Sequence, residues 1–362
     1  MLRFIQSELV FHVFVIQRPD YRSSDQEMER THSAQCQSMG LLANNIYNLS
    51  LSLVTDDSEF ETSLPTAVDF GSFTPERIDL LGDLITERFG RSCHEHLREV
   101  GGGIMQLAST LERSPQVTVP KTVLNLKMPS RPDAGLVILF SGQHGLGRSF
   151  QKLSKCIPGD HFVIAFDYDG LDSNSAPVKS VDQSIDLFFN ALLRDHPGIL
   201  DEMASSGQEV VLFGLCLGSC FAHAFAHRIS RDHDLNIRLV FFDGHPAEWF
   251  SKTSVRSLFR SSKKALEFAR TRGDLERRLV RQGRRQHHML SKHTSRKVNF
   301  PALLIRSNSV GASWDLTQES WQPYVRSCRH VDLLDISHID LIQRRQESRV
   351  SSLLEPGARL TV

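Results

Sequence analysis

The chain has 362 residues, of which 40% are hydrophobic, and its 42 Lys and Arg balance its 42 Asp and Glu to a formal net charge of zero. This length and apolar content allow one large domain beside a smaller module, and the charge balance argues against a partner such as nucleic acid bound along the whole chain. The six cysteines show neither metal-ligand spacing nor a dense disulfide pattern, so we expect a cytoplasmic protein without a bound metal. No run reaches the roughly 18 uncharged apolar residues of a membrane helix, so we expect no membrane contact.

Residues 1–65 have poor hydrophobic periodicity and many Ser, Asn and Gln residues. This composition predicts a weakly ordered N-terminal segment with room for one strand. Its apolar beginning is interrupted by Glu8 and His12 and lacks the small-residue cleavage site of a signal peptide.

Residues 66–115 predict a small helical module. Thr74 is the expected N-cap and Pro75 the first residue of a helix whose apolar residues recur at helical spacing up to the stop signal Gly90. A second short helix is expected in the stretch "IMQLASTLERS". Residues 116–133 contain three prolines and predict a linker.

From residue 134 onward, short apolar runs alternate with amphipathic stretches. The expected strands are 136–142, 162–168, 209–214, 238–244, 302–307 and 330–336, and a helix is expected at 180–196. This alternation predicts an α/β fold with a mostly parallel, doubly wound sheet. In such sheets the reactive residues gather at the carboxyl ends of the strands.

Charge is unevenly distributed along the chain. Residues 251–300 contain 15 Lys and Arg against three acids, a balance of +12, whereas residues 51–100 contain 11 acids against four Arg, a balance of −7. Both blocks look helical. A basic run of this kind is more often a solvated helix face than a binding site.

The segment "EVVLFGLCLGS", residues 209–219, joins a strand to a G-x-C-x-G turn and a helix start. This is the nucleophile-elbow pattern with Cys216 in place of serine. Gly214 and Gly218 suit a turn too tight for a Cβ beside the nucleophile, and the Leu217 N–H at the helix start could hold an oxyanion. The alternative is that Cys216 is a small apolar residue packed into a glycine-rich bend.

Two further residues would complete a catalytic triad. Asp243 follows the strand "RLVFF" and His338 follows the last expected strand, so the chain order is nucleophile, acid, base, as in α/β-hydrolases. Because each residue follows a different strand, all three can meet at one edge of the sheet. Asp315, after the strand "LLIRS", is an alternative acid. Asp335 is a weaker one, since it lies only three residues before His338.

The loop "SGQHGLGRSF", residues 141–150, follows the first expected strand of the α/β domain. Folds of this kind build the second half of the oxyanion hole here, so the expected donor is a backbone N–H near Gln143 or His144. An ordinary glycine-rich turn is the alternative. The loop is not a phosphate-binding loop, because no GK[ST] follows.

These segments resemble the thioesterase domains that end polyketide synthases and nonribosomal peptide synthetases. The resemblance covers about residues 134–345, from the oxyanion loop through the elbow and "RLVFFDGHP" to "SHIDLI". It implies an α/β-hydrolase fold with a helical lid at 247–300 and a Cys-His-Asp thioesterase that needs no cofactor. The implied substrate is a polyketide or peptide-like acyl thioester on CoA or on the phosphopantetheine arm of a carrier protein of a synthase, released by hydrolysis or cyclisation. This elbow departs from the usual one in its cysteine, the rarer nucleophile, and in Ser219, where a second glycine is common.

Other functions stay open at this point. The "GLCLG" elbow also resembles that of dienelactone hydrolases, and a carboxylesterase or a non-catalytic binding partner of a synthase would share the fold; the early position of the acid favours the thioesterase. In the basic lid, Arg277, Arg281 and Arg284 would dock an acidic carrier protein or the phosphate of its arm. Residues 69–112 faintly resemble an acyl-carrier domain, but Pro75 stands where the modified serine belongs, so a degenerate carrier or a plain helical module is expected.

Overall fold

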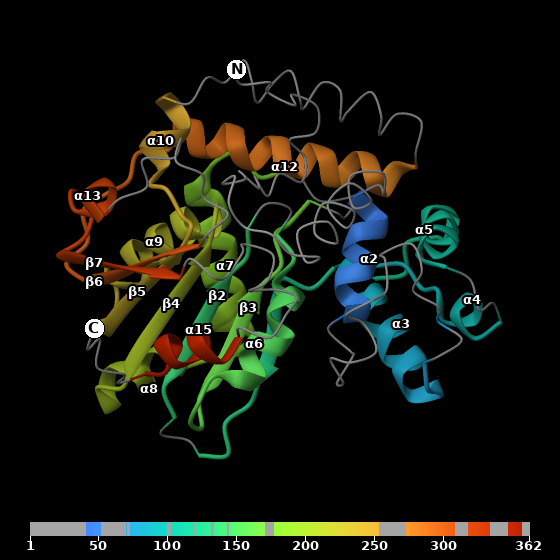
Figure 1. Ribbon diagram of the computed structural model, residues 1–362, viewed down its shortest axis with the longest axis horizontal. Coiled ribbons are helices and arrows are strands. Elements are labelled where there is room, and N and C mark those ends of the chain that lie inside the picture. Colours follow the sequence, from blue (N-terminus) through green and yellow to red (C-terminus); the bar gives the residue numbers. More distant parts are fainter. Residues whose placement is uncertain are drawn as a thin grey trace, which may run out of the picture.

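The computed structural model describes residues 41–51, 70, 73–99, 103–118, 120–131, 134–142, 145–170, 177–252, 273–307, 318–333 and 347–356. Within these residues, seven strands form one sheet in the order β1-β3-β2-β4-β5-β6-β7 (Figure 1). The antiparallel pair is β1 with β3, and the other neighbouring strands are parallel. The strands are β1 (Val123–Lys127), β2 (Leu136–Phe140), β3 (Phe162–Phe166), β4 (Glu209–Leu215), β5 (Asn236–Phe242), β6 (Pro301–Ser307) and β7 (Ser327–Leu333).

Helices cover both faces of this sheet, which explains the continuous apolar runs of its central strands. All five residues of β2 and of β3 are buried. On one face, α7 (Val181–Asp195) and α9 (Gly218–Ile229) pack with Phe188 and Phe225 against Ile138 of β2. On the other face, α6 (Gln151–Cys156) and α15 (Glu347–Leu354) pack against a second cluster that includes Val137. The predicted α/β-hydrolase fold is confirmed.

The six predicted strands correspond to β2 through β7, with boundaries that differ by up to three residues. The last strand begins at Ser327, three residues before the expected 330, because it is an edge strand with four exposed or half-exposed polar positions and gives a weak apolar signal. The prediction of a linker at 116–133 is wrong for Val123–Lys127. Those residues form β1, whose Val123, Leu124 and Leu126 are buried. The prolines on both sides of this strand are typical of a linker, which is why the sequence did not predict a strand here.

A helical module precedes the sheet and consists of α2 (Leu41–Leu51), α3 (Pro75–Phe89), α4 (His94–Glu99) and α5 (Ile104–Arg113). The expected caps are present, since the Thr74 hydroxyl accepts a hydrogen bond from the Arg77 N–H at 3.4 Å and Gly90 has φ 68°. The prediction that residues 1–65 are weakly ordered is wrong for α2, whose Ile46 and Leu49 are fully buried in the module. The rest of 1–65 lies outside the described residues.

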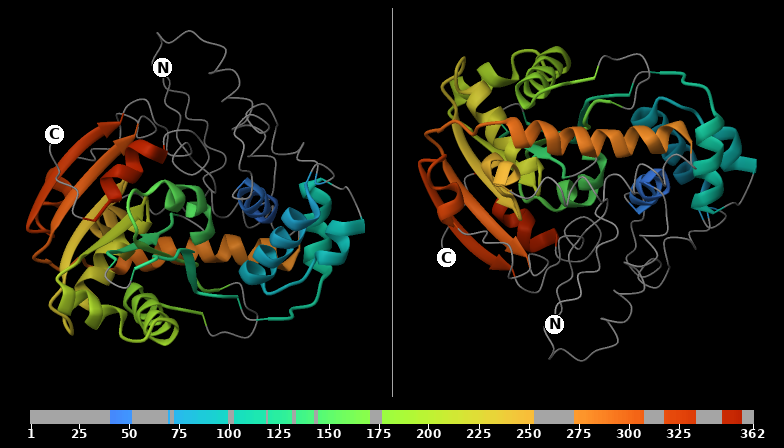
Figure 2. Two further views of the ribbon diagram at one scale, coloured as in Figure 1. Left: turned by 90° about the horizontal axis from the view of Figure 1, so that it is seen from below. Right: turned by 90° about the horizontal axis from the view of Figure 1, so that it is seen from above.

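The predicted lid contains α10 (Ala247–Lys252) and α12 (Asp274–Lys292), and residues 253–272 lie outside the described part. Figure 2 shows α12 running from the α/β domain to the helical module. The core of the module continues into Leu146 and into Leu275, Leu279 and Val280 of α12. The module and the α/β domain therefore share one hydrophobic cluster.

The remaining described helices are short: η3 (Gly147–Phe150), α8 (Ile199–Ser206) and α13 (Gln318–Trp321). No helix among the described residues combines the length and the apolarity that a bilayer crossing needs.

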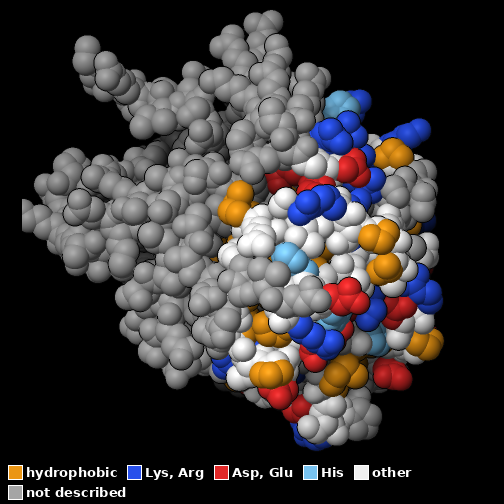
Figure 3. All heavy atoms as spheres, turned by 90° about the vertical axis from the view of Figure 1, so that its right-hand side faces the viewer, with side chains coloured by type: hydrophobic (Ala, Val, Ile, Leu, Met, Phe, Trp, Pro, Cys, Tyr) orange, Lys and Arg blue, Asp and Glu red, His pale blue; other side chains and the backbone are white. Residues whose placement is uncertain are grey.

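The outer surface of the helical module carries both signs of charge. Figure 3, which views this side, shows acidic and basic side chains interspersed with small hydrophobic patches. Some of the charges are paired: Arg98 contacts Asp79 at 2.7 Å and His94 contacts Asp83 at 3.3 Å. Both contacts lie within residues 51–100, so they leave the net acidic balance of that block unchanged.

Candidate active site

Cys216 lies on the sharp turn between β4 and α9. Its φ is 54°, a left-handed conformation that costs a non-glycine residue free energy and is typical of a nucleophile elbow. The turn is held from two sides, because the Cys216 N–H donates to the Phe242 carbonyl at 2.8 Å and the Ser219 N–H donates to the Cys216 carbonyl at 3.1 Å. Cys216 is half-buried and packs against the hydrophobic clusters on both faces of the sheet.

The glycines around this turn are required by close backbone approach. A Cβ on Gly218 would lie 2.6 Å from the Ser141 carbonyl oxygen, and one on Gly214 would lie 2.5 Å from the Ser219 backbone nitrogen. Ser219, the departure from the usual elbow, donates its hydroxyl to the Gly214 carbonyl at 2.8 Å. The unusual serine therefore adds a hydrogen bond inside the turn.

The expected oxyanion donors come from two segments. The Leu217 N–H, one residue after the cysteine, has no acceptor within the part of the chain that the structure describes. Gln143 and His144 lie outside the described residues, but both ends of their loop are placed. Gly142 lies against the elbow, since a Cβ on it would be 3.5 Å from the Cys216 Cβ, and the Gly145 N–H donates to the Gly142 carbonyl at 3.1 Å.

Asp243 leaves the sheet beside Cys216. Leu215 and Phe242 are register partners at the ends of β4 and β5, so the residue after each stands at the same carboxyl edge. Asp243 also has a positive φ, 50°, and is only 1% exposed. Its side chain accepts hydrogen bonds from the Ser307 N–H at 2.7 Å and from the Ser307 hydroxyl at 2.5 Å. These bonds hold the carboxyl group in one orientation.

Sequence reasoning missed Ser307 as the partner of Asp243. The available signal was its position at the end of β6, the parallel strand next to that of the acid.

His338 and the alternative acids Asp315 and Asp335 lie outside the described residues. β7 ends at Leu333, which is the register partner of Ser307, so the chain enters the histidine segment from the sheet edge that carries Asp243. The described residues thus bring together Cys216, Leu217, Gly142 and Asp243. The expected base, His338, is outside them.

Two described histidines close to this edge are buried. His245 stacks on Trp249 with ring centroids 4.3 Å apart, and burial lowers its pKa to about 4. Burial also lowers the pKa of His223 to about 4, and His223 Nε2 lies 3.2 Å from the Tyr324 carbonyl. Both rings are therefore neutral at pH 7.

A small cavity opens between α12 and the carboxyl edge of the sheet. Its volume is about 20 Å³, roughly what one water molecule requires, and it is too small for an acyl chain. It is lined on one side by the aromatic rings of Tyr168, Phe188 and Phe221 and on the other by Gln282 and Arg285 of α12. Gln282 donates through Nε2 to the Tyr168 carbonyl at 3.1 Å, and burial lowers the pKa of the Arg285 guanidinium.

This cavity is connected to the elbow through Tyr168. The Tyr168 hydroxyl donates to the Ser141 carbonyl at 2.7 Å, and Ser141 precedes the Gly142 that touches Cys216. The cavity therefore lies on the sheet edge where ligands of α/β folds bind.

The predicted docking arginines lie at helical spacing on α12. Arg281 is exposed, whereas Arg277 and Arg284 are half-buried, and Arg277 contacts Asp274 at 3.9 Å. No group of three metal-ligating side chains occurs among the residues described.

No protein-family model and no curated protein sequence matches this chain. Among solved structures, it is similar to the Vlm2 thioesterase domain bound with a dodecadepsipeptide, at 18% identity over 64% of this chain and 96% of that chain, with a TM-score of 0.47. The NocB thioesterase domain in covalent complex with a fluorophosphonate nocardicin G analogue is 14% identical over the same shares, with a TM-score of 0.47. A four-domain nonribosomal peptide synthetase, holo-AB3403 bound to AMP and glycine, is 12% identical over 94% of this chain and 26% of that chain, with a TM-score of 0.55.

The synthetase similarity is one of fold. Because it covers 94% of this chain, it extends beyond the α/β domain and includes the helical module. This chain spans only about a quarter of that synthetase's length, 26%. At 12% identity this similarity shows a shared fold alone, over the α/β domain and the helical module.

Proposed function

We propose that this protein is a thioesterase that uses Cys216 as its nucleophile, His338 as its base and Asp243 as the acid that orients the base. The observation that carries the proposal is the pairing of two strained residues at one sheet edge. Cys216 and Asp243 both have positive φ, and they follow the register partners Leu215 and Phe242. Strain of this kind persists where the surrounding structure maintains it, and it concentrates at functional sites.

The reaction would proceed in two steps. His338 takes the thiol proton while the sulfur of Cys216 attacks the thioester carbonyl, and the tetrahedral oxyanion is held by the Leu217 N–H and a donor from the 143–144 loop. Collapse of this intermediate breaks the bond to the leaving thiol, which receives the proton from His338. Water or an internal nucleophile of the acyl chain then attacks the acyl-cysteine, and the acid or the ring leaves while the Cys216 thiol is regenerated.

A sulfur nucleophile favours particular products. The acyl-cysteine is itself a thioester, which is more reactive than the oxygen ester that a serine would form. The acyl-cysteine would therefore be reactive enough for transfer to a weak internal nucleophile, which gives a cyclic product. The acyl group would be polyketide-like or peptide-like and carried on CoA or on the phosphopantetheine arm of a carrier protein.

The arginines Arg277, Arg281 and Arg284 would receive the phosphate or an acidic carrier. Their spacing on α12 places them on one face of the helix, and Arg281 is exposed there. α12 also contributes Gln282 and Arg285 to the cavity next to the elbow. The same helix would thus contact the arm through its outer face and line the small cavity next to the elbow with its inner face.

Labelling with iodoacetamide at pH 7 tests the nucleophile with an internal control. Cys156 on α6 is exposed and far from the elbow in sequence, so it reports an ordinary accessible thiol. We expect Cys216 to be alkylated faster than Cys156, and a model acyl thioester to protect Cys216 alone. If Cys216 is the slower of the two and the thioester protects neither, the protein is a non-catalytic relative. Hydrolysis of oxygen esters in preference to thioesters would instead indicate a carboxylesterase or a dienelactone-type hydrolase.

A further inference from the structure

The helical module supplies the N-terminal cap of α12. α12 begins after Gly273, which has no side chain to cap it, and the carboxylate of Glu112 from α5 takes that place. Glu112 accepts hydrogen bonds from the Leu275 N–H at 2.9 Å and from the Glu276 N–H at 2.9 Å. A Cβ on Gly273 would collide with the Glu112 carboxylate, so the glycine and the glutamate fit each other.

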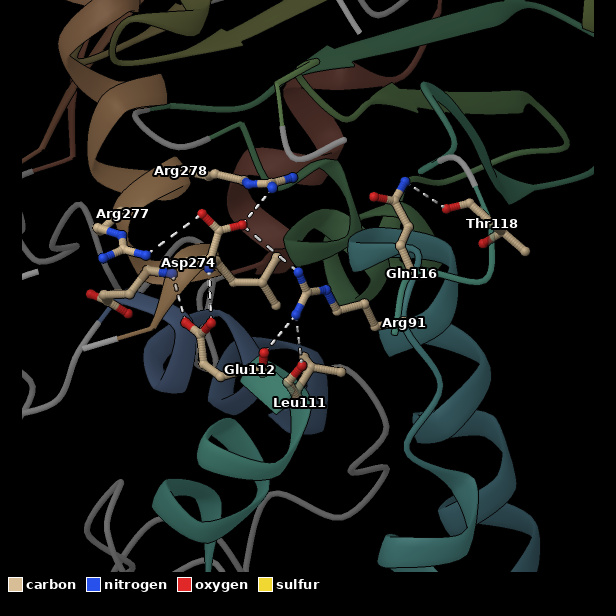
Figure 4. Close-up of polar contacts among 10 residues, drawn as sticks. Arg91, Leu111, Glu112, Gln116, Thr118, Asp274, Arg277 and Arg278 are labelled. Atoms are coloured by element: carbon tan, nitrogen blue, oxygen red, sulfur yellow. Dashed lines mark hydrogen bonds and ion pairs between the residues drawn. The ribbon is translucent and has the colours of Figure 1, made fainter. Parts of the chain in front are cut away.

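Neighbouring polar groups reinforce this contact (Figure 4). Arg91 donates to the Glu112 carbonyl at 2.7 Å and to the Leu111 carbonyl at 3.3 Å, and it contacts Asp274 of α12 at 3.8 Å. In return, Glu276 of α12 accepts from the Leu42 N–H at the start of α2 at 2.6 Å. A negative carboxylate at each helix N-terminus is electrostatically favourable.

The same module also holds the segment that follows the expected oxyanion loop. Leu146 belongs to the hydrophobic core of the module. Arg148 pairs with Glu87 of α3, and the buried Arg88 of α3 contacts Asp167 at 3.6 Å. Two walls of the candidate site, α12 and the segment after residue 145, are thus fixed by one module.

We propose that the helical module is a fixed clamp on the active site, and that Glu112 is a positioning residue that sets α12 and thereby the cavity wall formed by its Gln282 and Arg285. The role in substrate binding rests on the proposed thioesterase function, whereas the clamp itself rests on the contacts above. A module joined by a shared core and a buried ion pair does not move as an independent carrier would. Among its acidic residues, Glu112 caps α12, and Asp79 and Glu87 form ion pairs.

Hydrogen–deuterium exchange of Glu112→Ala and Glu112→Gln tests the clamp without requiring activity. We expect amides in the first turns of α12 to exchange about tenfold faster in Glu112→Ala, because an N-cap is lost, while amides of α9 keep their protection. Glu112→Gln keeps one carbonyl acceptor, so its exchange rate in the first turns of α12 should lie between those of the parent and of Glu112→Ala. Glu95→Ala, which removes an exposed carboxylate from α4 of the same module, should change neither helix. Unchanged α12 protection in Glu112→Ala, or equal loss in α12 and α9, would overturn the clamp.

Steady-state kinetics on an N-acetylcysteamine acyl thioester then tests the positioning role. We expect Glu112→Ala to raise KM about tenfold with kcat within threefold of the parent, because Gln282 and Arg285 of α12 line the cavity whereas Cys216 lies on the turn between β4 and α9. Glu112→Gln should raise KM by less than Glu112→Ala does. An equal fall in kcat with KM unchanged would overturn the positioning role. If the parent protein turns over no thioester, the proposed function fails, and the exchange result still decides the clamp.

Discussion

The buried ion pair between Arg88 and Asp167 joins the helical module to the α/β domain, and its removal has a calculable effect. The side chains are 2% and 3% exposed, so solvent does not screen the pair, and Asp167 also accepts a hydrogen bond from the Gly147 N–H. Burial raises the pKa of Asp167 and lowers the pKa of Arg88. Arg88→Met leaves a buried carboxylate without its cation, which costs about 3–5 kcal/mol of unfolding free energy. Asp167→Asn, which leaves a buried guanidinium, should cost a similar amount.

The double variant Arg88→Met/Asp167→Asn separates the charge effect from packing. It removes both charges and keeps an acceptor for the Gly147 N–H, so we expect it to lie within about 1 kcal/mol of the parent. Urea unfolding followed by tryptophan fluorescence measures the four free energies of the cycle. The penalty of Arg88→Met should shrink as the pH falls toward 5, because burial raises the pKa of Asp167 and its carboxyl group can then bind a proton. Additive single effects, or a loss below about 1 kcal/mol in Arg88→Met, would refute this reasoning.

Three further predictions concern the site and its surroundings. Gly218→Ala should cost at least about 2 kcal/mol in urea unfolding, because its Cβ would lie 2.6 Å from the Ser141 carbonyl oxygen; a neutral effect would contradict the tight elbow. Ser307→Ala should lower kcat/KM for an acyl thioester by about tenfold through loss of the hydroxyl bond to Asp243, with Ser307→Thr closer to the parent. The pKa values of His223 and His245, lowered to about 4, mean that the unfolded chain binds more protons between pH 6.5 and 4, so stability falls as the pH falls through that range. By pH 5 each histidine should remove about 2 kcal/mol, and His223→Gln should flatten the urea midpoint against pH.

Features encoded by short local patterns could be predicted from the sequence. The strands β2 to β6 are buried apolar runs, and the caps Thr74 and Gly90 of α3 act on residues within one helical turn. The elbow was predictable because its constraint is local as well. Gly214 and Gly218 flank the nucleophile position within five residues, and no larger side chain fits them.

Features that depend on contacts between distant segments could not be predicted. Glu112 lies 163 residues from the Leu275 N–H that it caps, and Ser307 lies 64 residues from Asp243. Neither contact leaves a periodic signal in the sequence. The helix α2 was not predicted for a related reason. Its Asn and Ser residues weaken the helical pattern, and its apolar residues are buried by contacts with the rest of the module.

The most direct test of the thioesterase proposal is the intact mass of the protein after incubation with a model acyl thioester. We predict one acyl adduct that maps to Cys216 by peptide fragmentation and is lost in Cys216→Ala. An unmodified protein under conditions that alkylate Cys156, or an adduct on another residue, would contradict the assignment of Cys216 as the nucleophile.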